Sequence, residues 1–239
     1  MIPLQRPDAP PRTVTLLERW TERVRVDGAT SAVARTHWNN AAAAKKHLHR
    51  LLEPMAAGIT RCMYCEDSLG TDIDHFQPIR VAPLRAFDWP NHLLACSHCN
   101  SNAKRDAYPC DANRVCLLVD PTAEDPSDHL TLLLRSGHYQ PRTPKGTETI
   151  KVFALNRDGL VRGRQTAFLM AGPALRDWHA KILAGDHDEA RAIATALRYT
   201  PYPAVLRAMV RVPPSRAQQI LGSPEAAAAA AAWKAHHGT

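Results

Sequence analysis

Three features are missing from the sequence, and each absence excludes a class of protein. The 239 residues contain no uninterrupted apolar run approaching the ~18 residues that a membrane-spanning helix needs. The first residues, MIPLQRPDAPPRTVTLLERW, lack the apolar core of a secretory signal peptide. The six cysteines are no dense disulfide framework, because a chain of this length can bury a hydrophobic core of its own. We therefore expect a cytoplasmic protein whose cysteines are metal ligands or buried thiols.

The charge balance is basic but uneven along the chain. Lys and Arg outnumber Asp and Glu by 30 to 23, a formal charge of +7, which suits an anionic partner such as nucleic acid. The excess falls in the first sixty residues, with nine basic against five acidic, and in 181–239, with seven against four, whereas 61–110 is not basic. A nucleic-acid backbone would therefore be held by flanking helices, and a solvated helix face is the alternative interpretation. The candidates are Arg23, Arg25, Arg35, Lys45, Lys46 and Arg50.

Apolar periodicity predicts a mainly helical α+β fold. Four prolines make 1–12 an extended lead-in, and one helix each is expected over 13–26 and over 31–52. We divide the chain into an N-terminal helical region (1–59), a cysteine-bearing core (60–110), a mainly helical C-terminal region (111–222) and an alanine-rich tail (223–239), which we expect to be frayed. The cysteine-bearing core should contain a hairpin leading into a short helix near Ser97. One further strand is expected at HLTLLL, residues 129–134.

Two CxxC pairs predict a structural zinc site. Cys62 and Cys65 form the first pair, Cys96 and Cys99 repeat its spacing, and four thiolates complete a tetrahedral zinc site. A single CxxC would also fit a redox dithiol, but a redox pair needs no second copy. The remaining cysteines lack this spacing, so we expect both to be buried thiols. They are Cys110 and Cys116.

The residues between and after the two pairs suit phosphodiester hydrolysis. Asp74 and Asn100 offer the oxygen ligands that Mg²⁺ prefers, and His75 can take a proton from water near neutral pH. Asn91 can fix a neighbouring backbone segment or the imidazole. Lys104 and Arg105 follow on the predicted helix as candidate phosphate contacts. Further candidates with a plainer surface alternative are Asp72, His92, His98, Arg157, Arg162 and Arg164.

This arrangement resembles the ββα-metal motif of HNH endonucleases. The matching residues are Asp74-His75, then Asn91, then the run CSHCN, in the variant with Asn at the third motif position. The resemblance implies that His75 is the general base, that Asp74 and Asn100 hold a catalytic Mg²⁺ or Mn²⁺, and that Asn91 orients the site. It also implies that the CxxC pairs bind structural Zn²⁺. Asn in place of the commoner His leaves the catalytic metal open.

A narrower resemblance covers about residues 60 to 170. The segments CMYCE, DHFQP and DWPNHLLACSHCNSNAKRD are similar to HNH proteins encoded beside ATPases in bacterial anti-phage systems of the retron and Septu kind. This implies a DNA-cutting defence effector with a companion ATPase and no membrane partner. The alternatives are a non-catalytic zinc module that binds nucleic acid or protein, and a thiol oxidoreductase. DNA or RNA as the substrate, and the oligomeric state, stay open.

Overall fold

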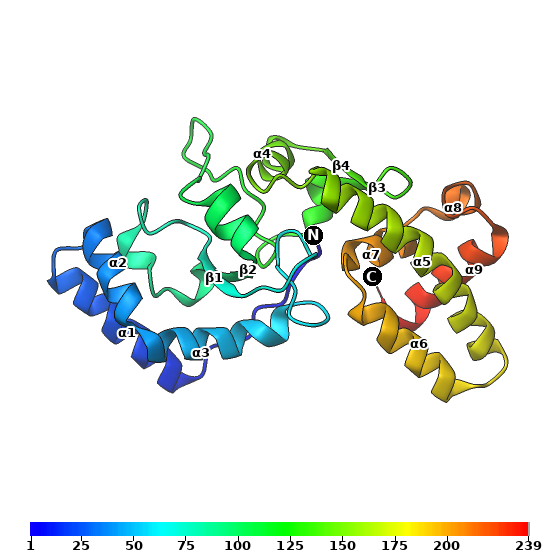
Figure 1. Ribbon diagram of the computed structural model, residues 1–239, viewed down its shortest axis with the longest axis horizontal. Coiled ribbons are helices and arrows are strands. Elements are labelled where there is room, and N and C mark those ends of the chain that lie inside the picture. The colour runs from blue at the N-terminus through cyan, green and yellow to red at the C-terminus, as the bar shows by residue number, and fades with distance from the viewer. Residues whose placement is uncertain (239) are drawn as a thin grey trace.

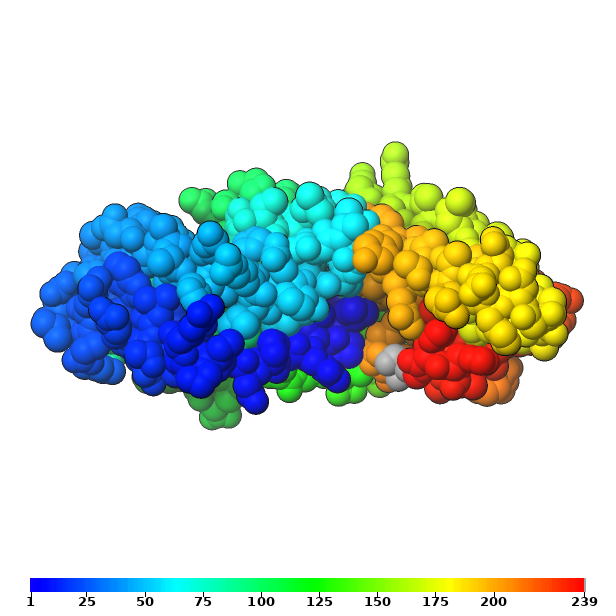
Figure 2. Space-filling view, turned by 90° about the horizontal axis from the view of Figure 1, so that it is seen from below, coloured from blue at the N-terminus to red at the C-terminus, as the bar shows by residue number. Residues whose placement is uncertain are grey.

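The computed structural model describes residues 1–238 and shows an elongated molecule (Figure 1). The N-terminal helices and the first hairpin form one end, the last helices form the other, and a second hairpin lies between them. Figure 2 shows the first residues, in the darkest blue, reaching from the N-terminal helices to the middle of the molecule. The helices are α1 Pro11–Val26, α2 Ser31–Asn40, α3 Ala42–Leu52, α4 Pro144–Val152, α5 Asp158–Leu183, α6 His187–Tyr199, α7 Pro203–Val210, α8 Pro214–Leu221 and α9 Pro224–His237. The strands are β1 Asp72–His75, β2 His92–Ala95, β3 Leu130–Leu133 and β4 His138–Pro141.

The predicted mainly helical α+β fold is confirmed, with two small antiparallel sheets among the helices. Within residues 1–238, no helix combines the length and the apolar character needed to cross a lipid bilayer. One hydrophobic core joins the cysteine segment to the C-terminal helices, and a second lies between α1, α2, α3 and Phe87. The cysteine segment therefore contributes to both cores.

The N-terminal end contains three helices where two were expected. The predicted helix over 31–52 is wrong as a single element, because Ala41 leaves the helical region with a ψ of 49°. Asn39 and Asn40 precede the break, and asparagine side chains compete with helical backbone bonds. The break turns α3 away from α2, and Leu48 of α3 is buried in the second core.

The first hairpin and the helical turn that follows it agree with the predicted order. β1 pairs antiparallel with β2, with Asp74 opposite Leu93 and His75 opposite His92. A wide π-type helical turn then covers His98–Lys104. Leu93 anchors this unit because it is fully buried.

The alanine-rich segment is packed, so the expectation of a frayed tail is wrong. It forms α9, whose N-cap Ser223 accepts a hydrogen bond from the Ala226 backbone. Ala229 and Ala230 are buried, and the ring of Trp233 lies 4.9 Å from that of Trp178 on α5. Alanine permits this close approach of helices, which composition alone does not reveal. The strand predicted at HLTLLL is present as β3, and its partner β4 was not predicted.

Candidate functional site

The four cysteines of the CxxC pairs form one buried cluster. Their sulfur atoms all lie within 4.8 Å of one another, and Cys65 Sγ lies 3.8 Å from Cys96 Sγ. Zinc–sulfur bonds of about 2.3 Å in a tetrahedron place sulfurs roughly 3.8 Å apart. All six cysteines are free thiols. The four residues therefore fit a tetrahedral zinc ion.

The cluster is built from the two ends of the first hairpin. The Met63 N–H donates to the Leu94 carbonyl at 2.9 Å, which fixes the first pair against β2. Cys96 follows β2 directly, and the helical turn carries Cys99. Hydrogen bonding with Cys62 lowers the pKa of the Cys65 thiol and raises that of Cys99. Zinc ligation requires thiolates, so binding of a zinc ion at this cluster would be accompanied by loss of thiol protons.

Asp74 lies on β1 with both carboxylate oxygens hydrogen-bonded. The Tyr64 hydroxyl donates to Oδ2 at 2.6 Å, and the Lys104 ammonium donates to Oδ1 at 2.9 Å. Burial, together with Asp74, raises the pKa of Tyr64 well above its usual value, so the phenol remains a donor. A carboxylate offers about four lone-pair sites, so Asp74 retains acceptor capacity toward the pocket it lines.

Lys104 has a different position from the one expected. Its side chain is buried, and its ammonium donates to Asp74 and to the His75 carbonyl at 2.6 Å. The Lys104 ammonium is therefore not exposed to solvent, and the expected contact between Lys104 and a phosphate is wrong for this structure. Lys104 was expected only as a phosphate contact and Tyr64 was not expected in the site, because nothing in their local sequence marks an internal partner.

The imidazole of His75 has a defined tautomer. Its Nε2 lies 3.0 Å from the Ala86 carbonyl, which can only accept, so Nε2 carries the hydrogen and Nδ1 keeps its lone pair. Burial lowers the pKa of His75 to about 4, although Asp74 raises it in part. The Trp38 ring covers the imidazole edge-on at a centroid distance of 4.4 Å. His75 is therefore neutral at neutral pH and can accept a proton.

Asn91 fixes the loop that holds His75. Its amide donates to the carbonyls of Gln77 and Arg85, each at 3.0 Å, and its carbonyl accepts from the Gln77 N–H at 2.8 Å. Ala86, whose carbonyl accepts from His75, directly follows Arg85 in the chain. Asn91 thus acts on the imidazole through the backbone, a relation that the sequence does not display.

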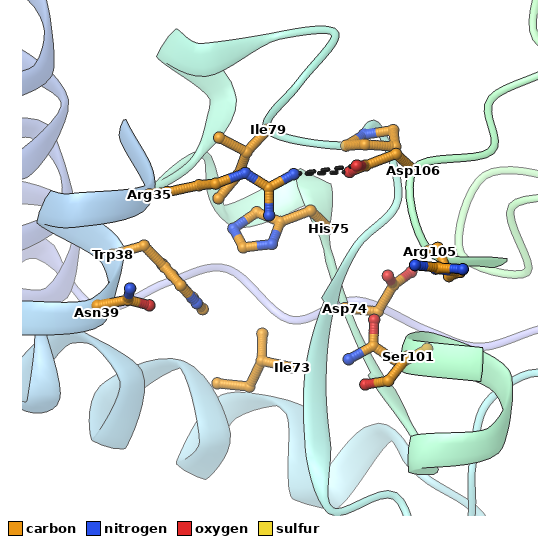
Figure 3. Close-up of a pocket in the computed structure, with 12 residues that line it drawn as sticks. Arg35, Trp38, Asn39, Ile73, Asp74, His75, Ile79, Ser101, Arg105 and Asp106 are labelled. Atoms are coloured by element: carbon orange, nitrogen blue, oxygen red, sulfur yellow. Dashed lines mark hydrogen bonds and ion pairs between the residues drawn. The ribbon is translucent and has the colours of Figure 1, made fainter. Parts of the chain in front are cut away.

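A pocket of about 400 Å³ brings together His75, Asp74 and Asn100 (Figure 3). The Asn100 amide nitrogen donates to Asp72 at 3.3 Å, which leaves its carbonyl oxygen free to accept. Figure 3 shows His75 between Arg35 and Trp38 on one side and Asp74 and Ser101 on the other. Arg35 crosses the pocket to Asp106, with one N–O distance of 2.9 Å.

A second hollow of about 630 Å³ adjoins this pocket and shares Trp38 and Ile73 with it. Three predicted phosphate contacts line the hollow: Lys45, Lys46 and Arg50. Arg35 and Arg105 line the first pocket. Arg105 has a φ of +50°, which is strained for a residue with a side chain. We call the two hollows together the basic groove.

Several other candidates lie outside the basic groove. Arg25 pairs with Glu22 on α1, and Arg23 covers the Trp20 ring. The phosphate role suggested for Arg164 is wrong, because its buried guanidinium donates to the carbonyls of Gly137 and Leu155.

Among the remaining cysteines and histidines, Cys110 and His92 differ from expectation, whereas His98 lies at the surface as its plainer interpretation predicts. Cys110 is exposed and lies opposite the half-buried Cys116 across an isolated β-bridge, so the prediction of two buried thiols is wrong for Cys110. His98 is exposed. His92 is fully buried, and its Nε2 lies 3.1 Å from the same Ala86 carbonyl that His75 contacts.

Comparisons with known proteins give two relatives of one kind. No family model matches the chain, and no solved structure is a significant match. The Septu protein PtuB of Bacillus mycoides (strain KBAB4) is 29% identical over 145 residues, which cover 48% of this chain and 48% of the relative. The Septu protein PtuB of Bacillus thuringiensis is 25% identical over 170 residues, covering 69% of this chain and 58% of the relative. The chain spans about half the length of these curated relatives, and it is similar to Septu PtuB proteins over that part.

Proposed function

We propose that this chain is a metal-dependent HNH-type endonuclease that hydrolyses phosphodiester bonds in DNA and serves as an effector of bacterial anti-phage defence. One observation carries the proposal: His75, with its Nδ1 acceptor, shares a pocket with Asp74 and Asn100, and this pocket adjoins the hollow lined by basic residues of α3. The similarity to Septu PtuB proteins supports the defence role and a companion protein, for which a defence ATPase is the expectation.

The oxygen donors suit a hard divalent cation. Asp74 retains acceptor capacity, and the Asn100 carbonyl oxygen is free because its amide nitrogen donates to Asp72. Both residues would hold Mg²⁺ or Mn²⁺, which supplies charge stabilisation at the phosphate and the leaving oxygen when bound. The four-cysteine cluster would hold Zn²⁺ and fix the two ends of the hairpin that carries Asp74.

His75 acts as the general base in this proposal. Its Nδ1 accepts a proton from water as the water oxygen forms a bond to phosphorus and the bond from phosphorus to the leaving oxygen breaks. The Nε2–H stays on the Ala86 carbonyl, so the ring does not turn. A pKa of about 4 makes the free imidazole a weak base. A bound phosphate anion raises that pKa toward the working pH. Asn91 is a positioning residue that holds the loop ending at Ala86.

The basic groove would hold the DNA backbone. Lys45, Lys46 and Arg50 lie along α3, while Arg35 and Arg105 flank the pocket itself. Such contacts depend on phosphate charge rather than base identity, so we expect little sequence preference and strong salt dependence. Targeting would come from the companion protein.

Plasmid cleavage tests this proposal. Wild-type protein should nick supercoiled plasmid with Mg²⁺ or Mn²⁺, and His75→Ala should retain zinc while losing at least about a hundredfold in rate, as expected for a general base. The exposed His98→Ala is the matched control and should cut normally. Equal nicking by wild type and His75→Ala would refute the assignment.

A non-catalytic zinc module that binds nucleic acid or protein is the second candidate. The observation in its favour is that Lys104 and Tyr64 already bind both oxygens of Asp74, which balances its charge without a divalent ion. This candidate predicts DNA binding that is indifferent to Mg²⁺, with no cleavage by any variant. A thiol oxidoreductase is less well supported, because all four CxxC sulfurs converge in one buried cluster.

A further inference from the structure

A cleft of about 1,090 Å³ lies in the other half of the molecule, between the β3–β4 hairpin and helices α7 and α8. Figure 1 shows α8 on the far side of the hairpin from α1, α2 and α3. The cleft shares no lining residue with the basic groove. A role for this cleft is therefore separate from the proposed cleavage chemistry.

One wall of the cleft is strand β3, which pairs with β4 on one edge and, within residues 1–238, with no strand on the other. Arg142 N–H donates to the His129 carbonyl at 2.8 Å, so His129 and Arg142 are a hydrogen-bonded pair of the antiparallel ladder. Such pairs alternate along a ladder, and Pro141, opposite Leu130, has no N–H to donate. The backbone N–H and C=O groups of Leu132 consequently point away from β4. They offer hydrogen bonds to an additional strand.

The opposite wall and the rim are cationic. Five arginines and a single aspartate line the cleft: Arg135, Arg142, Arg207, Arg211, Arg216 and Asp128. Asp125 lies behind this wall and accepts from Arg207 at 2.7 Å and from Arg211 at 3.1 Å. Arg142 and Arg216 are exposed, and neither forms an ion pair within residues 1–238. The positive charge thus exceeds what neighbouring acids balance.

The floor of the cleft is apolar. Leu132, Leu134, Val212 and Ile220 line it, and Leu133 at its edge is 41% exposed. A nucleic-acid backbone gains little from such a floor, whereas alternate side chains of a bound strand fit apolar pockets while its backbone pairs with the sheet edge. The cationic rim favours acidic residues on the face of the bound strand that points away from the apolar floor.

We propose that this cleft binds an extended acidic segment of a protein partner, which adds a strand to the free edge of β3. The partner's backbone pairs with Leu132, its apolar side chains contact the leucine floor, and its carboxylates face Arg142 and Arg216. The inference goes beyond the proposed nuclease function and needs no catalysis.

Fluorescence anisotropy with a labelled peptide of alternating Glu and Val tests the proposal. The full chain should bind the peptide in a salt-dependent manner, and the double variant Arg142→Glu/Arg216→Glu should bind it at least about tenfold more weakly. Arg12→Glu on α1 is the control and should bind like wild type. A peptide N-methylated at alternate residues should also bind about tenfold more weakly, because it cannot pair with a strand edge.

Three results would overturn the proposal: absence of binding, equal binding by the double variant, or displacement of the peptide by a short DNA duplex acting at these arginines. His75→Ala should bind the peptide like wild type. A failure of the nuclease assignment is therefore distinguishable from a failure of the docking site.

Discussion

The ammonium of Lys104 lies 2.9 Å from Oδ1 of Asp74, and the two side chains are only 0% and 3% exposed. An ion pair so deeply buried is costly to break, because the remaining partner becomes an uncompensated charge in a poorly solvated place. The pair joins β1 to the end of the helical turn that carries Cys99 and Asn100. The carboxylate expected to hold the catalytic metal is thus also a structural anchor.

The first prediction concerns this pair. Lys104→Met keeps most of the side-chain volume but leaves Asp74 without its cation, so we expect a loss of about 3–5 kcal/mol in the free energy of unfolding. Urea unfolding of the zinc-loaded protein measures it, with exposed Lys46→Met as the control that should change little. Adding Asp74→Asn to Lys104→Met should recover part of the loss. Unchanged stability combined with weaker DNA binding would instead support the phosphate contact first expected for Lys104.

The second prediction concerns the cysteines. In zinc-loaded protein we expect a thiol reagent to react quickly with exposed Cys110, more slowly with half-buried Cys116, and with the remaining four only after a strong chelator is added. Cys62→Ser should lower zinc content and thermal stability together, whereas Cys110→Ser should change neither. Rapid reaction of all six thiols in the presence of zinc would contradict the closed cluster.

The sequence predicts the site residues that belong to short motifs with a characteristic spacing. The CxxC pairs indicate a metal site by their spacing, and Asp74-His75, Asn91 and Asn100 indicate phosphate chemistry by their types and order. The structure gathers Asp74, His75 and Asn100 in one pocket. The supporting contacts were not predictable. The Ala86 carbonyl that fixes His75 is a backbone group, and Asn91 reaches His75 only through the folded loop.

The fold was predictable to a similar extent. Periodicity located α1 and the C-terminal helices because their apolar faces recur at helical spacing. It missed the break at Ala41 and the packing of α9, since alanine gives a helical signal without indicating what covers it. Lys104 was placed on the surface because lysine is seldom buried, and its partner Asp74 is distant in sequence.

The third prediction concerns pH. Burial lowers the pKa of His92 well below its usual value, so the folded protein keeps this imidazole neutral while the unfolded chain protonates it below about pH 6.5. The unfolded state then binds more protons, and stability falls as the pH drops below that value, by up to about 1.4 kcal/mol per pH unit for one group.

His92→Phe tests this contribution, because it retains an aromatic ring against Trp38, whose centroid lies 5.3 Å from that of His92. The Ala86 carbonyl still accepts from His75. Protonation of zinc ligands affects both proteins alike, so the unfolding free energies between pH 7.5 and 5.5 should decline less steeply for the variant. Parallel curves for the two proteins would show that His92 contributes nothing to the pH dependence.

The last prediction concerns the ion pair between Arg35 and Asp106 across the pocket. Both side chains are about half exposed, at 52% and 42%, so the pair contributes only about 0–1 kcal/mol to stability. Its carboxylate nevertheless competes with phosphate for Arg35 and adds negative charge beside the proposed DNA path. Asp106→Asn should therefore leave the unfolding free energy nearly unchanged while tightening DNA binding and steepening its salt dependence by about one charge. Anisotropy in a His75→Ala background avoids cleavage, and Asp188→Asn on α6, with a side chain 93% exposed, controls for net charge. If Asp106→Asn weakened binding instead, the guanidinium would need the carboxylate to hold it toward the substrate, and Asp106 would be a positioning residue rather than a competitor.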